Sequence, residues 1–78
     1  MNTLNLTNDN SRRARIYVTA LELQQPYTDS HKRAVRMLTR HAELIEAGQP
    51  TGYSHPDFIL EKCGVEVTAS EYANAENI

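Results

Sequence analysis

Residues 29–47 carry the pattern that most constrains this fold, because their apolar side chains recur with the 3.6-residue period of an α-helix. Three residues at the start of the segment favour helix N-caps: Thr28, Asp29 and Ser30. Gly48 follows the last periodic residue, and Pro50 comes soon after it, as is usual beyond a helix C-terminus. The segment therefore predicts one continuous helix of about five turns.

One side of this predicted helix is apolar and wide. The side chains that share it are Ala34, Val35, Leu38, His41, Ala42 and Ile45. Met37 and Leu44 lie beside them and extend the apolar side to about half of the circumference. One neighbouring helix rarely covers so much, so Met37, Leu44 and His41 are the candidate protein-interface residues. The alternative is that two other helices cover this side from two directions.

Residues 11–25 carry a weaker helical pattern that competes with a strand pattern. The residues spaced as on one helix face are Ala14, Tyr17, Val18 and Leu21. Asn10 or Ser11 would cap this helix, and Pro26 would end it. Residues 16–19, Ile-Tyr-Val-Thr, are however strong strand formers. A helix is favoured, with a strand as the alternative.

Two capping-box patterns predict two short helices near the C-terminus. The sequence Ser-His-Pro-Asp at residues 54–57 would open a helix through residues 58–60 that stops at Gly64. The sequence Thr-Ala-Ser-Glu at residues 68–71 would open the last helix. Residues 65–67, Val-Glu-Val, are either an extended link or a strand.

These elements predict an all-α fold, a small bundle of three to four helices around one long central helix. Residues 11–78 form the single domain, and the polar, Asn-rich residues 1–10 are predicted to be a flexible N-terminal arm. The alternative is an α+β fold in which residues 15–21 and residues 65–68 form a short two-stranded pairing.

Composition limits the size of the core and the cellular location. The chain has 78 residues, 40% of them apolar, with four Tyr, one Phe and no Trp. So thin a core favours stabilisation by a partner or by oligomerisation. Cys63 is the single cysteine and cannot form a disulfide within the chain. We find no membrane-length apolar stretch and no export signal, so we expect a cytoplasmic protein without a membrane partner.

The net charge of −2 conceals an uneven distribution of charge. Residues 41–78 have one basic and seven acidic side chains, whereas residues 1–40 have seven basic and three acidic ones. The candidate nucleic-acid-binding residues are these seven basic ones: Arg12, Arg13, Arg15, Lys32, Arg33, Arg36 and Arg40. A row of cations on a helix suits phosphate groups. The alternative is a solvated helix face partly neutralised by Glu43 and Glu46.

The C-terminal helices resemble a helix-turn-helix motif in outline, with Gly64 in the turn and a branched residue after it. The helix that would enter the major groove, residues 69–76, contains Glu71 and Glu76 and no Lys or Arg. Such a helix would repel DNA, because base and phosphate contacts need donors. We therefore expect a structural role for this turn.

Residue types that perform catalysis or bind metals are present without the spacing that these roles need. His31 and His41 would lie about 80° apart around the helix and about 15 Å apart along it, too far to share a metal ion. Cys63 would lie near a helix C-terminus, which disfavours a thiolate. We therefore expect no catalytic residue, no metal, no cofactor and no small-molecule substrate.

The sequence favours a non-catalytic regulatory, adaptor or inhibitor module that binds a protein partner or self-associates. The alternative is a nucleic-acid-binding accessory protein that uses the basic helix face. Small chains of this type are frequent among bacterial and phage accessory proteins, but the residues do not resemble one particular family.

Overall fold

The computed structural model describes the backbone of residues 3–78 and the side chains of residues 9–78. Its helices are α1 (Thr3–Glu22), α2 (Asp29–Glu46), α3 (Asp57–Cys63) and α4 (Ala69–Glu76). No strand occurs within residues 3–78, so the predicted all-α fold is confirmed and the α+β alternative is wrong. Residues 15–21 belong to α1, and residues 65–68 are an unpaired link to α4.

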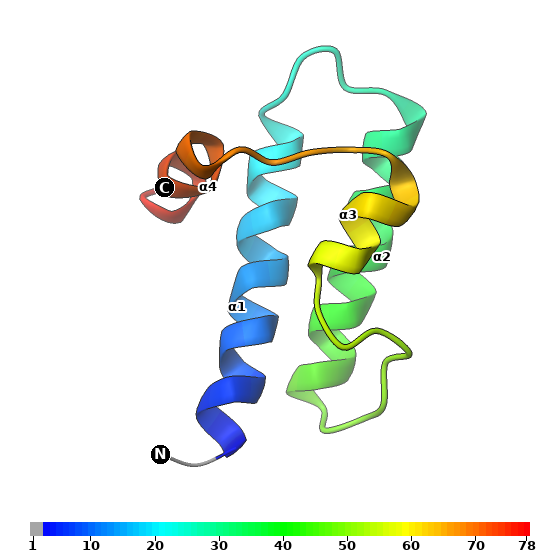
Figure 1. The fold of residues 1–78 in the computed structure, drawn as a ribbon, viewed down its shortest axis with the longest axis vertical. Helices are drawn as coiled ribbons and strands as arrows, with labels where there is room; N and C mark the ends of the chain where they lie inside the picture. Colours follow the sequence, from blue (N-terminus) through cyan, green and yellow to red (C-terminus); the bar gives the residue numbers. More distant parts are fainter. Residues whose placement is uncertain (1–2) are drawn as a thin grey trace.

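The two long helices α1 and α2 stand side by side and run in opposite directions (Figure 1). The short helix α3 packs on α2, and the link after it crosses α1 to reach α4. Helix α4 packs on α1, on the side away from α2. Helix α1 therefore lies between α2 and α4, whereas α2 packs on α1 and α3.

Helix α2 confirms the predicted long helix almost residue for residue. Thr28 is its N-cap, and its hydroxyl accepts a hydrogen bond from the backbone N–H of His31. The ring Nδ1 of His31 accepts from the backbone N–H of Thr28, so a histidine completes the capping box. The helix ends before Gly48, whose φ of 72° only glycine adopts easily.

Helix α1 begins earlier than the sequence pattern predicts. We expected a start at Asn10 or Ser11 after a flexible arm, but residues 3–10 are helical, and residues 1–2 lie outside the described part. Ser11 does not cap a helix because it lies inside one. Its buried hydroxyl donates to the carboxylate of Glu46 on α2, a tertiary contact that local spacing does not reveal.

The two C-terminal capping boxes have different outcomes. The predicted box at Thr68 is confirmed: its hydroxyl accepts from the N–H of Glu71, whose carboxylate accepts from the N–H of Thr68. The predicted box at Ser54 is wrong, because α3 has Pro56 as its N-cap and no side-chain cap. Asp57 is the first residue of α3 and not its third, and its carboxylate binds Arg13 and Tyr17 of α1.

The main core lies where α1, α2 and α3 meet. Leu21, Leu38 and Ile59 are its largest fully buried apolar side chains, one from each helix. A smaller cluster of Ile16 and Ala20 with Ala75 joins α1 to α4. The two clusters show that α1 contributes to both cores, whereas α2 contributes to the main core alone.

Candidate protein-binding groove

A groove of about 340 Å³ lies along the flank of α2 that α1 and α3 leave free. The α2 side chains that line it are Arg36, Met37, Arg40, His41 and Leu44. Thr51 and Tyr53, from the connection between α2 and α3, form the opposite wall. The structure thus brings together the three predicted protein-interface residues and two of the predicted nucleic-acid-binding ones.

The predicted wide apolar side of α2 is only partly covered. Ala34, Leu38 and Ala42 are fully buried in the core cluster that also contains α1 and α3 residues. Met37 is half-buried, with its sulfur 3.7 Å from the Sγ atom of Cys63, and Leu44 is also half-buried. Helices α1 and α3 therefore cover the apolar side of α2 from two directions, but they leave Met37 and Leu44 partly exposed.

The connection between α2 and α3 places Tyr53 against α2. Gly48 and Gly52 have positive φ angles of 72° and 86°, which allow the chain to reverse direction twice within a few residues. The Thr51 hydroxyl donates to the carbonyl of Tyr53 over 2.7 Å and accepts from the N–H of Tyr53. This local turn sets the Tyr53 ring edge-to-face on His41, with centroids 6.3 Å apart.

His41 forms the floor of the groove rather than its exposed surface. Only 2% of the residue is exposed, and neither ring nitrogen has a hydrogen-bond partner among the described residues. Burial lowers the pKa of His41, because a charged imidazolium is poorly solvated there. A buried polar group without a partner typically costs about 1–3 kcal/mol, so this position is expensive for stability alone.

The rim of the groove is cationic. Arg36 and Arg40 are exposed, lie one helical turn apart, and take part in no ion pair within the described part of the chain. Lys32 and Arg33 are also exposed and also have no ion pair among the described residues. The four basic side chains of α2 therefore form an exposed stripe. Glu43 lies about 20° from Arg36 around the helix and weakens that stripe.

The arginines of α1 differ from this stripe in that each has a carboxylate partner, and the proposed nucleic-acid contacts of all seven basic residues stay a prediction. Arg12 pairs with Glu76 of α4 over 2.5 Å, Arg13 with Asp57 of α3 over 3.0 Å, and Arg15 with Glu46 of α2 over 2.7 Å. Each arginine therefore connects α1 to a different helix. The acidic residues that determine this arrangement are distant in sequence, which is why spacing within α1 could not reveal it.

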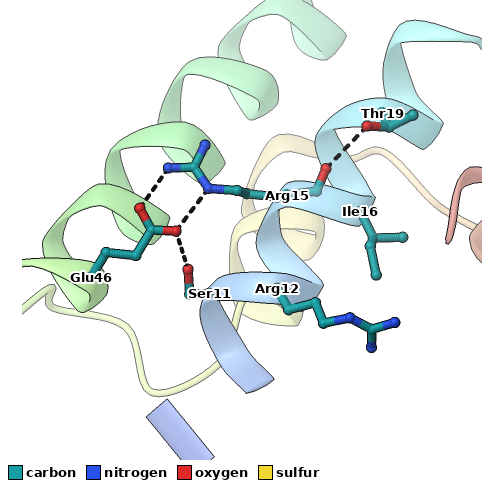
Figure 2. A pocket seen from close by; sticks show the side chains of 6 residues that line it. All are labelled: Ser11, Arg12, Arg15, Ile16, Thr19 and Glu46. Carbon is teal, nitrogen blue, oxygen red and sulfur yellow. Dashed lines mark hydrogen bonds and ion pairs between the residues drawn. The ribbon is translucent and has the colours of Figure 1, made fainter. Parts of the chain in front are cut away.

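A second depression, of about 520 Å³, lies beside the Arg15–Glu46 pair. Figure 2 shows Arg15 and Ser11 of α1 reaching Glu46 of α2, while Arg12 and Ile16 extend away from that contact. The hydrogen bonds from Arg15 and Ser11 lower the pKa of Glu46 to about 2. Because the charged groups beside this depression already pair with other side chains, it presents fewer unpaired charges to a ligand than the groove on α2 does.

The remaining sequence-based candidates do not form a site. Within residues 9–78, no three His, Cys, Asp or Glu side chains are close enough together to hold a metal ion. None of the helices α1 to α4 is both long and apolar enough to cross a membrane. Helices α3 and α4 do not pack on each other in the described structure, so the resemblance to a helix-turn-helix is superficial.

Comparisons with models of protein families, with curated proteins and with solved structures found no match for this chain. Sequence reasoning missed Thr51 and Tyr53, which form one wall of the groove on α2. The only signal for them was an aromatic residue in a Gly- and Pro-containing connection, which is too common to be diagnostic.

Proposed function

We propose that this chain is a non-catalytic binding module, a small regulator, adaptor or inhibitor that receives a segment of another protein in the groove on α2. The observation that carries the proposal is an apolar groove with two unpaired guanidinium groups at its rim, on the one flank of α2 without a neighbouring helix. Apolar floors with charged rims are typical of protein contact surfaces.

The chemistry of the groove favours binding over catalysis. His41 is its only imidazole, and it is buried beneath Tyr53 with no nucleophile hydrogen-bonded to it in the described structure. The Thr51 hydroxyl is already used by the backbone of Tyr53. By contrast, covering Met37 and Leu44 would remove apolar surface from water, with a gain of about 25 cal/mol per Å².

The test is capture of partners from a lysate of the source cells with the full chain, after nuclease treatment. We expect a protein that the wild type retains and that Met37→Asp and Leu44→Asp both lose. Phe58→Asp is the matched control, because Phe58 is 49% exposed on α3 and does not line the groove. Circular dichroism verifies that each variant is folded. Equal capture by the wild type and both groove variants would refute the proposal.

Self-association is a separate outcome of the same design. Sedimentation equilibrium of the purified chain would show a dimer that Leu44→Asp dissociates and Phe58→Asp leaves intact. That result would mean that the groove binds a second copy of the chain and not a different protein. A monomer under all conditions, together with groove-dependent capture, is the result that the proposal expects.

Nucleic-acid binding is the second candidate, favoured by the exposed and unpaired Lys32, Arg33, Arg36 and Arg40. Each phosphate contact should make the logarithm of the affinity fall with the logarithm of salt concentration, by a slope of about −0.9 on duplex DNA. Anisotropy titrations with labelled duplex DNA and single-stranded RNA test this. The double variant Arg36→Glu, Arg40→Glu should abolish such binding, and Lys62→Glu on α3 is the control for charge alone.

We also propose a cytoplasmic location. Cys63 is half-buried and carries a free thiol, which lies 3.7 Å from the Met37 sulfur. A chain without a disulfide is compatible with a reducing compartment. Fractionation of cells that express a tagged chain tests this location, and recovery in a membrane or secreted fraction would contradict it.

A further inference from the structure

We propose that the groove selects an acidic, apolar segment of its partner. A large apolar side chain lies on Met37 and Leu44, a carboxylate lies between Arg36 and Arg40, and a polar group of the segment bonds to His41. This inference rests on the proposed function, because it names the chemistry of the occupant of that same groove.

Two guanidinium groups at the rim of the groove are free to bind a carboxylate. Arg36 and Arg40 are exposed and without an ion pair in the described structure, although the chain has ten acidic side chains. Residues four apart on a helix are separated by about 5–6 Å, so a single carboxylate can lie between their guanidinium groups.

The chain itself shows what such an arginine does when a carboxylate is near. Arg15 donates to Glu46 from two nitrogens, over 2.8 Å and 2.7 Å. Both side chains are about half-exposed, which resembles the environment at the rim of the groove. Since a guanidinium and a carboxylate match each other in shape as well as in charge, an acidic partner segment has a defined place to bind.

The charge of the rest of the molecule adds selectivity. The chain has a net charge of −2, residues 41–78 contain seven acidic side chains, and none of these lines the groove or pairs with Arg36 or Arg40 in the described structure. An acidic segment is therefore repelled by much of the C-terminal half and attracted at the rim. Such a combination restricts where the segment can dock.

His41 supplies the second, independent observation. It is 98% buried by area, lines the groove, and has two ring nitrogens without partners. Tyr53 lies edge-to-face against it, its backbone is held by Thr51, and its side chain is half-buried at the edge of the core with no hydrogen bond from its hydroxyl among the described contacts. A segment that displaces the Tyr53 ring gives His41 a hydrogen-bond partner, so the unmet bond of the free protein is made in the complex.

The experiment is selection of a displayed library of random short peptides against the folded full chain. Peptides that also bind the Leu44→Asp variant are removed, so that only groove-dependent binders remain. We expect these binders to be enriched in Asp or Glu next to a large apolar residue. The change Arg36→Glu with Arg40→Glu should weaken them by at least about tenfold, and Lys62→Glu should leave them unchanged.

Two exchanges make the test specific. Replacing the acidic residue of a selected peptide by Lys should abolish binding to the wild type and restore binding to the variant with Glu at positions 36 and 40. His41→Leu should weaken the peptides by about tenfold while the chain remains folded by circular dichroism. Unchanged affinity in the His41→Leu variant would overturn the contact with His41.

The outcomes separate this inference from the proposed function. Groove-dependent peptides that are neutral or basic, and indifferent to the arginine variants, would overturn the inference and leave the binding module standing. A library that yields no peptide whose binding depends on Leu44 would overturn both. Selected acidic peptides with charge-swap recovery support both.

Discussion

Helices α1 and α2 are both long, amphipathic and rich in arginine, but their arginines do different things. Each of Arg12, Arg13 and Arg15 on α1 has a carboxylate from another helix, whereas Arg36 and Arg40 on α2 have none in the described structure. Helix α1 has neighbours on opposite sides, and α2 leaves one flank free. The difference teaches that a basic helix face is structural or available for binding according to what the fold places beside it.

The largest expected effect is on stability, and it should distinguish the buried side of α2 from the flank that lines the groove. Leu38 is fully buried, and we expect Leu38→Ala to reduce the free energy of unfolding by about 2–5 kcal/mol because it leaves a cavity. Leu44 borders the groove and is half-buried, so Leu44→Ala should cost much less. Urea denaturation measures both. Equal losses would mean that the groove flank is as tightly packed as the core.

The next effect concerns the buried His41. We expect His41→Leu to raise the free energy of unfolding by about 1–3 kcal/mol, because it replaces an unpartnered polar ring by an apolar side chain. The same variant should bind its partner less well. Thermal melting and a binding titration on one preparation measure the two together. A destabilised variant would show that the ring has a packing role that the leucine does not fill.

The free energy of unfolding of the wild type should also depend on pH through His41. Burial lowers its pKa, so the unfolded chain takes up a proton at a higher pH than the folded chain does. The corresponding stability is complete above the ordinary pKa of about 6.5 and is lost as the pH falls below it. In denaturation curves over this range, the difference in the free energy of unfolding between His41→Leu and the wild type should therefore be constant above this pH and should grow at the acidic end.

A smaller effect concerns the start of α2. His31 closes the capping box and its Nε2 lies 2.7 Å from the Gln24 side chain after α1, so it joins the two helices. We expect His31→Ala to cost about 0.5–2 kcal/mol. His31→Glu should recover the cap but not the contact with Gln24. If both variants unfold at the same denaturant concentration, the cap contributes nothing measurable.

The smallest effects should come from the exposed arginines, and they test whether carboxylate partners distinguish the α1 arginines from the α2 arginines. Arg15→Gln should lower the melting temperature slightly, whereas Arg40→Gln should leave it unchanged. The Glu46 carboxylate has its pKa lowered to about 2, so its contribution is present above about pH 4.5 and is lost as the pH falls toward 2. Arg15→Gln should remove much of this acid dependence, and Arg40→Gln should retain it.

Local signals predicted the elements whose ends depend on neighbours in sequence. The helix of residues 29–47 was predicted to within one residue, and so was the capping box at Thr68, because both involve hydrogen bonds within a few residues. The box at Ser54 failed because α3 begins at Asp57, whose carboxylate binds Arg13 and Tyr17, forty or more residues away in the chain. Local spacing contains no information about such partners.

The candidate site was predicted in part, for the same reason. Met37, His41 and Leu44 follow from the period of one helix, as do the basic residues beside them. Tyr53 does not, because its place depends on the turn at Thr51 and on the direction in which the chain returns along α2. Nor does the period of α1 reveal that Arg12, Arg13 and Arg15 are paired, because their carboxylate partners come from three other helices.

The amino-acid sequence by itself determined that the chain is helical, that α2 has an apolar and a cationic flank, and where two of the helices begin. These properties depend on periodicity and on capping, which act over one or two turns. Only the tertiary structure decided which cations are paired, which apolar side chains stay uncovered, and that His41 is buried without a partner. Those outcomes depend on contacts between residues far apart in the chain, where folding places one helix against another.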